Sequence, residues 1–152
     1  MQISIRKAIL TDSEKIHSLI QHFAKKGIML ARSQQYIYDH VRDFFVAIKD
    51  KQVVGICAFT VSQKDLAEVK SLAVDEKHQK SGIARQLIEN GINDLKELGV
   101  KKVFCLTYVP GLFEKMGFTQ VAKESLPHKI WTECINCPSF PDCDEIALTK
   151  EI

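Results

Sequence analysis

Apolar and polar residues alternate at the start of the chain, which is the period of a β-strand with one buried face. The first strand is predicted over residues 2–8, where Ile3 and Ile5 stand between polar neighbours. The same period, or a short apolar run, predicts further strands over residues 43–49, 53–61, 66–74, 100–107, 118–122 and 144–149. Polar turns at residues 50–52 and 63–65 separate three of them, so these three are expected to form antiparallel hairpins.

Two longer segments carry apolar residues at spacings of three and four, the pattern of an amphipathic helix. The first follows Thr11-Asp12-Ser13-Glu14, which fits a capping box with Thr11 as N-cap, and it ends near Gly27. The second covers residues 82–98, and its buried face is predicted to hold Ile83, Leu87, Ile88, Ile92, Leu95 and Leu98. Shorter helices are predicted from Ser33 to about Val41 and from Pro110.

The order of these elements predicts an α/β (α+β) fold with a mixed, mostly antiparallel sheet rather than a doubly wound parallel sheet. A length of 152 residues suits a single domain over residues 1–152 with a sizeable core. The net charge of +2 argues against nucleic acid or an anionic membrane as a partner. No apolar run approaches the roughly 20 residues of a membrane span, and residues 1–10 lack a signal-peptide pattern. We therefore expect a cytoplasmic protein.

A polar loop, Gln79-Lys80-Ser81-Gly82-Ile83-Ala84, joins the strand at 66–74 to the long helix. Free N–H groups at a helix N-terminus, together with the helix dipole, favour a phosphate there. The loop lacks the first glycine of G-x-x-x-x-G-K-[ST], and G-x-G-x-x-G is absent, which argues against nucleoside triphosphates and dinucleotides. The loop therefore predicts another phosphate-bearing ligand, the alternative being a helix start capped by Gly82.

Gln79, Gly82 and Ala84 match Arg/Gln-x-x-Gly-x-Gly/Ala, so the chain resembles the GNAT superfamily of N-acetyltransferases up to about Val121. The resemblance implies the GNAT fold, with helices on both faces of the sheet and a splayed pair of strands that holds acetyl-CoA. It implies that the backbones of Leu72 and Val74, with Ala73 between them, line the pantetheine arm. It assigns the pyrophosphate to the backbone of the loop, which comprises Gln79, Lys80, Ser81, Gly82, Ile83, Ala84 and Arg85.

Longer segments resemble the short, stand-alone N-acetylglutamate synthases of bacterial arginine biosynthesis. These segments are MLARS, VRDFFV, AEVKSLAV, VFCLTYVP, LFEKMGF, LPHKIW and CDEIAL, and they span nearly the whole chain. The resemblance implies transfer of an acetyl group from acetyl-CoA to the α-amine of L-glutamate in a ternary complex. Two alternatives stay open, namely transfer to another small amine or amino acid, and a non-catalytic module that binds acyl-CoA.

Acetyl transfer to an amine requires loss of a proton from the ammonium, polarisation of the thioester oxygen and protonation of the leaving thiolate. Glu68 is the candidate base, because it lies fourteen residues before Gly82, like the catalytic glutamate of histone-acetylating members; the alternative is an exposed carboxylate at a strand end. Tyr108 is the candidate acid, because its phenol is protonated at neutral pH; it could equally be a rim tyrosine or a substrate contact. Many superfamily members carry a tyrosine where this chain has Phe113.

Glutamate carries two carboxylates, so its pocket needs cations, of which arginine binds a carboxylate bidentately. Arg32 is the first candidate, because the loop that contains it commonly covers the acceptor site in the superfamily. Lys70 is the second, because it shares a strand face with Glu68. Both could instead be solvated surface charges. His128 and Lys129 are weaker candidates.

The chain has five cysteines, of which Cys57 and Cys105 lie in apolar strands and are expected in the core. Cys134, Cys137 and Cys143 cluster in the C-terminal segment 126–143. They are interpreted as packed thiols, as ligands of a structural zinc with His128 or Asp144, or as a labile disulfide between Cys134 and Cys137, and no metal is assigned. The expected partners are the small molecules acetyl-CoA and L-glutamate, with the choice between monomer and homodimer open.

Overall fold

The computed structural model describes residues 2–126 and 145–152. Within these ranges one sheet has the strand order β1-β2-β3-β4-β5-β7-β6. The strands are β1 (Ser4–Lys7), β2 (Phe44–Lys49), β3 (Gln52–Gln63), β4 (Leu66–Val74), β5 (Lys102–Thr107), β6 (Thr119–Val121) and β7 (Ile146–Glu151). The α-helices are α1 (Ser13–Lys25), α2 (Gln34–Asp39), α3 (Ile83–Leu98) and α4 (Pro110–Lys115), and the 3-10 turns are Leu10–Asp12, Val41–Asp43, Glu76–His78 and Lys123–Ser125.

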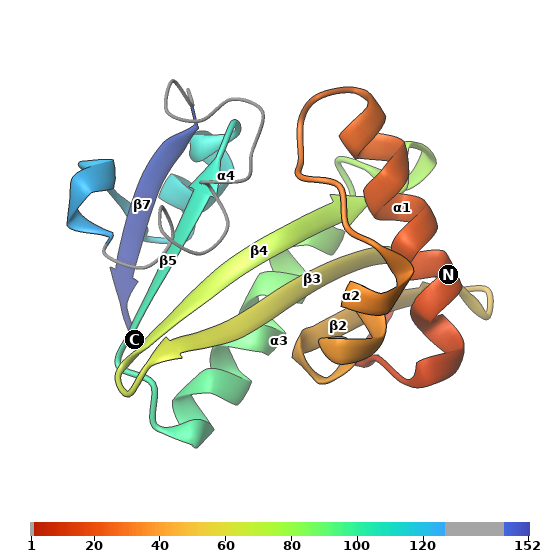
Figure 1. Ribbon diagram of the computed structural model, residues 1–152, viewed down its shortest axis with the longest axis horizontal. Coiled ribbons are helices and arrows are strands. Elements are labelled where there is room, and N and C mark those ends of the chain that lie inside the picture. The colour runs from red at the N-terminus through yellow and green to blue at the C-terminus, as the bar shows by residue number, and fades with distance from the viewer. Residues whose placement is uncertain (1, 127–144) are drawn as a thin grey trace.

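The sheet is mixed, as the sequence predicts, and among the described strands its one parallel pair is β4 with β5. That pair is short: only Leu66, Ala67 and Glu68 are opposite residues of β5. Beyond Glu68 the two strands diverge like the arms of a V (Figure 1). The splayed strand pair that the family resemblance implies is therefore present, and it consists of the fourth and fifth strands from the β1 edge.

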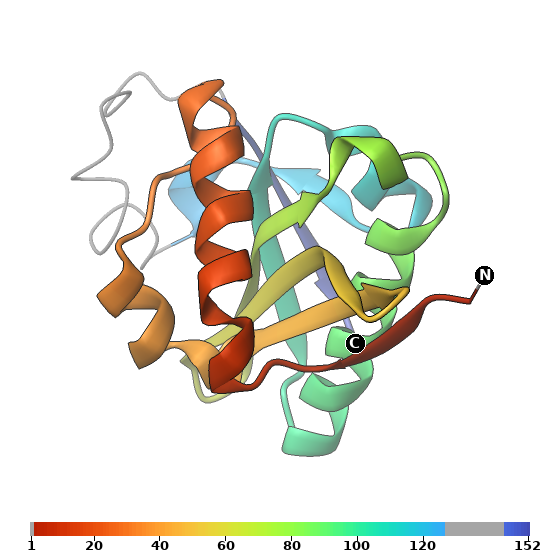
Figure 2. The ribbon, with the colours of Figure 1, turned by 90° about the vertical axis from the view of Figure 1, so that its right-hand side faces the viewer.

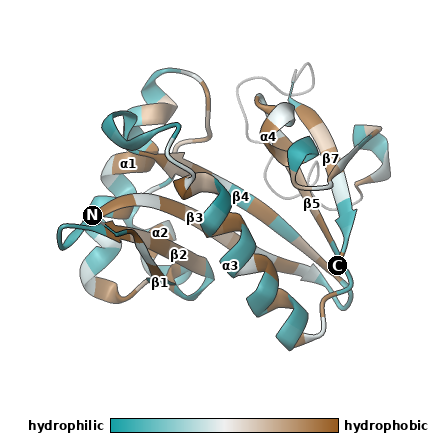
Figure 3. Cartoon of the chain, turned by 180° about the vertical axis from the view of Figure 1, so that it is seen from behind, coloured by the Kyte–Doolittle hydropathy of each residue, from teal (hydrophilic) through white to brown (hydrophobic). Residues whose placement is uncertain are grey.

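Helices cover both faces of the sheet. α1 and α2 lie on one face and α3 lies on the other (Figure 2). Under α3 the core contains Leu87, Ile88 and Ile92 against apolar residues of β3, β4 and β5. Under α1 and α2 a second cluster contains Ile16, Ile20 and Ile37. The outward side of α3 is largely hydrophilic (Figure 3), as its amphipathic pattern predicts.

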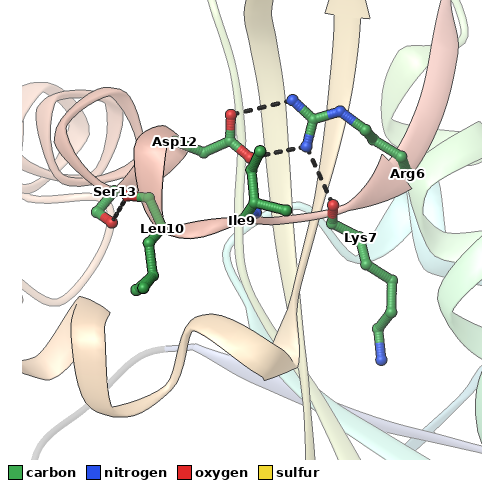
Figure 4. Close-up of polar contacts among 6 residues, drawn as sticks. All are labelled: Arg6, Lys7, Ile9, Leu10, Asp12 and Ser13. Atoms are coloured by element: carbon green, nitrogen blue, oxygen red, sulfur yellow. Dashed lines mark hydrogen bonds and ion pairs between the residues drawn. The ribbon is translucent and has the colours of Figure 1, made fainter.

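The first helix begins differently from the prediction. Thr11 lies in the 3-10 turn and Asp12 is the N-cap of α1, so the capping box with Thr11 is wrong. The carboxylate of Asp12 instead accepts hydrogen bonds from the Ile9 amide at 2.8 Å and from the Arg6 guanidinium at 2.8 and 3.1 Å (Figure 4). Burial raises the pKa of Asp12, but these hydrogen bonds outweigh it and the pKa is lowered. The pair ties β1 to the start of α1.

Other details of the prediction are confirmed or corrected. Ser33 caps α2 by accepting a hydrogen bond from the Tyr36 amide at 3.0 Å, and Gly99 ends α3 with a φ of 104°. Leu98, predicted on the buried face of α3, is 68% exposed because the helix ends there, beyond the apolar stripe. The last strand lies two residues later than predicted, at Ile146–Glu151. Among the described helices, none has the length and apolar content needed to cross a bilayer.

Candidate functional site

β4 contains a bulge at the point where β5 has moved away. Ala58 of β3 is opposite Lys70, whereas Ile56, two residues earlier, is opposite Ala73, so β4 has one residue more than β3. Ser71 is the extra residue, and its φ of 53° is in the left-handed region that residues other than glycine rarely adopt. The bulge exchanges the two faces of the strand: Ala67 and Val69 pack under α3 before it, as Leu72 and Val74 do after it.

The edge of β4 that faces β5 is open beyond Glu68. The last residue pair between the two strands is Glu68 with Phe104, and no described strand pairs with this edge of residues 70–74. Unpaired main-chain groups at a sheet edge can pair with an extended ligand. This open edge includes Leu72, Ala73 and Val74, whose backbones the family resemblance assigns to the pantetheine arm. The carbonyl of Val74, however, already accepts a hydrogen bond from the side chain of Gln79 at 3.0 Å.

The loop between β4 and α3 is shaped for an anion. Its backbone has positive φ at Lys80 (64°) and at Gly82 (85°), and the Ser81 hydroxyl donates to the carbonyl of His78. Among the described residues, no amide N–H of residues 80–85 donates a well-formed hydrogen bond to a backbone carbonyl outside the helices and strands. Free amides at the first turn of a 16-residue helix form a favourable place for phosphate oxygens.

The carboxylate of Glu76, in the segment before this loop, binds two side chains near the end of α1. Glu76 lies 2.6 Å from the ammonium of Lys26 and 2.7 Å from Nε2 of His22. Hydrogen bonds from Lys26 and then from His22 lower the pKa of Glu76 below its ordinary value. All three side chains are about half exposed, so the bridge is screened by solvent and contributes little to stability. It does, however, connect the helix on one face of the sheet with the loop that enters the helix on the other.

Glu68 lies where the two strands part, and it is buried, with 5% of its surface exposed. The alternative of an exposed strand-end carboxylate is therefore wrong. Its neighbour on β3 is Thr60, whose hydroxyl donates to Asp43 at 3.0 Å. By strand alternation Glu68 and Lys70 face α1 and α2. A buried carboxylate at the open end of a strand pair is placed to accept a proton.

The thiols of Cys57 and Cys105 lie in the core near this carboxylate and are unreactive as nucleophiles. Burial, and after it the charges of Glu68 and Glu145, raise the pKa of Cys105 to about 12. Burial raises the pKa of Cys57 well above its ordinary value, and the charge of Cys105 adds to this. Both thiols are at most 1% exposed, which confirms the expectation of core residues. Because the thiolate is the nucleophile, neither cysteine is placed to form a covalent intermediate.

Arg32 and Lys70, the two predicted acceptor cations, meet at one aromatic ring. Cζ of Arg32 lies 4.3 Å from the centroid of the Tyr36 ring, and Nζ of Lys70 lies 5.7 Å from it. Both are within the range of a cation–π interaction. The structure thus brings together a residue of the α1–α2 loop and a residue of β4, on the face that carries Glu68. Sequence reasoning missed Tyr36; its signal is a tyrosine four residues after Arg32 and three after the cap Ser33.

The remaining predicted residues divide into three groups. Tyr108 follows the last residue of β5 and is 39% exposed, so it lies at the wide end of the V. Phe113 is 3% exposed and packs edge-on against Phe118, so it is a core residue. Outside the described residues lie His128, Lys129, Cys134, Cys137, Cys143 and Asp144. Within the described chain, no three histidine, cysteine or acidic side chains gather as a metal site would require.

Comparison with known proteins gives three results. Residues 40–120 match the model of the acetyltransferase (GNAT) domain. An uncharacterized N-acetyltransferase of Chlorobaculum tepidum is 45% identical over 97% of this chain and 96% of its own length. An amino-acid acetyltransferase of Neisseria meningitidis serogroup A is 30% identical over 82% of this chain, but this region is only 29% of that enzyme.

Among solved structures, an N-acetylglutamate synthase from Neisseria gonorrhoeae, complexed with coenzyme A and N-acetyl-glutamate, superposes with a TM-score of 0.89. The likeness covers 99% of this chain and 35% of the synthase, at 24% sequence identity. At that identity the likeness is evidence for a shared fold.

Proposed function

The chain belongs to the GNAT family of acetyltransferases, and on that premise we propose that it transfers the acetyl group of acetyl-CoA to the α-amine of L-glutamate. This is the first step of arginine biosynthesis in the synthases that the chain resembles. One observation carries the choice of acceptor: Arg32 and Lys70 converge on Tyr36, on the face of the sheet that holds the buried Glu68. Two cations beside a buried base suit an amine that carries two carboxylates.

In this proposal the V between β4 and β5 holds acetyl-CoA, with its pantetheine arm along residues 72–74 and its pyrophosphate at the amides of residues 80–85. The neighbouring N-acetylglutamate synthase, which was solved with coenzyme A, supports acetyl-CoA as the cosubstrate. The bulge at Ser71 supports this placement, because its extra residue interrupts the pairing of β4 with β3 beside the open edge.

The side chains divide the proton transfers between them. Glu68 accepts the proton of the acceptor's ammonium, directly or through a water, so that the neutral amine attacks the thioester carbonyl. The C–S bond then breaks, Tyr108 donates a proton to the departing thiolate of coenzyme A, and the attacking nitrogen loses its second proton to solvent as the amide forms. Arg32 and Lys70 bind the carboxylates and hold the amine in line for attack. Both catalytic groups end the cycle by exchanging their protons with solvent.

The proposal is tested by incubating the protein with acetyl-CoA and single amino acids while following the free thiol and the mass of the product. We expect release of coenzyme A with glutamate and N-acetylglutamate as product, with weaker activity for aspartate and glutamine. If another amine is acetylated instead, the protein is an acetyltransferase but the assignment of glutamate as its acceptor is wrong. Coenzyme A binding without turnover of any amine would favour the non-catalytic module, the alternative that the buried Phe113 leaves open.

The phosphate loop makes a separate prediction. Gly82→Ala places a side chain at a φ of 85°, and nothing lies within 4 Å of the new Cβ. We expect a stability loss of about 1 kcal/mol from the left-handed backbone and, because the loop relaxes, about tenfold weaker coenzyme A binding by calorimetry. Gly99→Ala is the matched control, since Gly99 also has positive φ and open space but lies at the opposite end of the 16-residue helix α3. Equal coenzyme A affinity in the two variants would contradict the loop assignment.

A further inference from the structure

Tyr36 carries a buried polar atom that the described part of the chain does not satisfy. The side chain comes from α2, and its hydroxyl oxygen is buried without a hydrogen-bond partner among the described residues. A buried hydroxyl without a partner is destabilising, so native proteins rarely keep one without a reason. The position lies over the face of β4 that carries Glu68 and Lys70. A ligand on that face is therefore the natural partner of this hydroxyl.

The ring of Tyr36 is held firmly, so its hydroxyl has a fixed place. His40 stacks on the ring with a centroid distance of 4.0 Å and an angle of 22° between the planes. Nδ1 of His40 lies 2.8 Å from the main-chain carbonyl of Tyr36, and because a carbonyl only accepts, Nδ1 is the donor. This bond fixes the imidazole on one face of the phenol ring. The guanidinium of Arg32 also lies over the ring, 4.3 Å from the centroid.

The charges around the hydroxyl specify the chemistry of its partner. Tyr36 has a positive guanidinium and a positive ammonium within 6 Å of its ring centroid, and a phenol is protonated at neutral pH. A group that can accept from the phenol and that the two cations also attract is an anion. A carboxylate fits, since its two oxygens together accept about four hydrogen bonds.

We propose that the hydroxyl of Tyr36 donates a hydrogen bond to a carboxylate of the acceptor amino acid, and that Tyr36 is a specificity residue for carboxylate-bearing acceptors. The inference rests on the proposed function, of which it names the recognition element. Arg32 and Lys70 supply positive charge that attracts the carboxylate. The phenol of Tyr36, held in one place, supplies a hydrogen bond of fixed direction. A flexible cation alone binds carboxylates in many positions, whereas a fixed hydroxyl selects one.

The test compares Tyr36→Phe with Tyr38→Phe. Tyr38 lies two residues later on α2 and is 45% exposed, so it is the matched control. Tyr36→Phe keeps the ring for His40 and Arg32 and removes only the unsatisfied hydroxyl. We expect the KM for the acceptor to rise about tenfold, while kcat changes less than threefold and the KM for acetyl-CoA stays unchanged. The melting temperature should stay the same or rise, because a buried polar atom has been removed; a purely structural role would lower it.

The outcomes separate the inference from the proposed function. If the wild type acetylates glutamate but Tyr36→Phe has the KM of the wild type, the inference is overturned and the function stands. If the wild type prefers another amino acid and Tyr36→Phe raises the KM for it, the inference about Tyr36 stands. In that case the assignment of glutamate as the acceptor is wrong. Should no amino acid be acetylated, calorimetric titration of glutamate into the protein with coenzyme A decides. Absence of binding overturns both, and binding that Tyr36→Phe weakens supports the inference.

Discussion

Glu68→Gln is expected to lower kcat for acetyl transfer about 100-fold at neutral pH, within the range for loss of a general base. Glutamine has the same shape as glutamate and hydrogen-bonds through the same positions, but it does not accept the proton of the ammonium. Because Glu68 is 5% exposed, the neutral side chain is at least as easily buried, so the fold should be kept. Steady-state kinetics and a melting curve measure the two effects separately.

The pH profile identifies what Glu68 contributes. As the pH rises towards the pKa of the acceptor amine, more of the amine is neutral without help. The ratio of wild-type to variant kcat should therefore fall with pH if Glu68 is the base. Glu97→Gln, an exposed carboxylate on α3, is the control and should leave kcat unchanged. A Glu68→Gln enzyme within twofold of wild type at neutral pH would exclude this residue as the base.

Gly91→Ala is expected to lower the free energy of unfolding by about 2–3 kcal/mol, at the upper end for an overpacked core. Gly91 is in the middle of α3, where alanine is normally preferred by about 1 kcal/mol. Here, however, a Cβ would lie 2.0–2.3 Å from three ring atoms of Phe59. That ring cannot easily move aside, because it is 5% exposed and packs edge-on against Phe45. Helix and sheet must separate to admit the methyl group.

Thermal and denaturant unfolding measure this effect, with an expected fall in melting temperature of about 4–12 °C. Gly111→Ala is the control, since no atom lies within 4 Å of its Cβ and its φ is not in the left-handed region. The double variant Gly91→Ala with Phe59→Leu should recover part of the loss, because the smaller side chain leaves room. A Gly91→Ala protein as stable as Gly111→Ala would contradict the close approach of α3 to β3.

The sequence predicts the helices and strands well where the apolar periodicity is strong. It predicts them poorly where contacts between residues distant in sequence determine the local structure. α3 and the hairpin strands follow from apolar spacing. The start of α1 does not, because the Arg6–Asp12 pair overrides the local capping pattern at Thr11. The bulge in β4 leaves no local signal either: a serine, not a glycine, adopts positive φ at position 71. That conformation can be explained only from the three-dimensional structure, in which β5 has moved away from this edge of β4.

The candidate site likewise contains residues that the sequence predicts and residues that only the fold brings together. The loop at residues 79–85 and the carboxylate at position 68 can be read from a motif and its spacing. Tyr36 cannot, because its role depends on how α2 packs over β4 and on the meeting of Arg32 with Lys70, which are far apart in sequence. The residues proposed to bind the cosubstrate are thus local in sequence. The residues proposed to bind the acceptor come from separate elements that the fold brings together.

The three residue pairs that join β4 to β5 have a consequence for folding. They divide the sheet into two lobes, β1–β4 and β5–β7, that share a narrow hinge. A long, extended cosubstrate lying in the V would act as a missing strand between the lobes. Its binding energy would add to the folding energy, by about 2.7 kcal/mol at a concentration 100 times the Kd. The fraction of the protein that is folded would then depend on the supply of the acetyl donor.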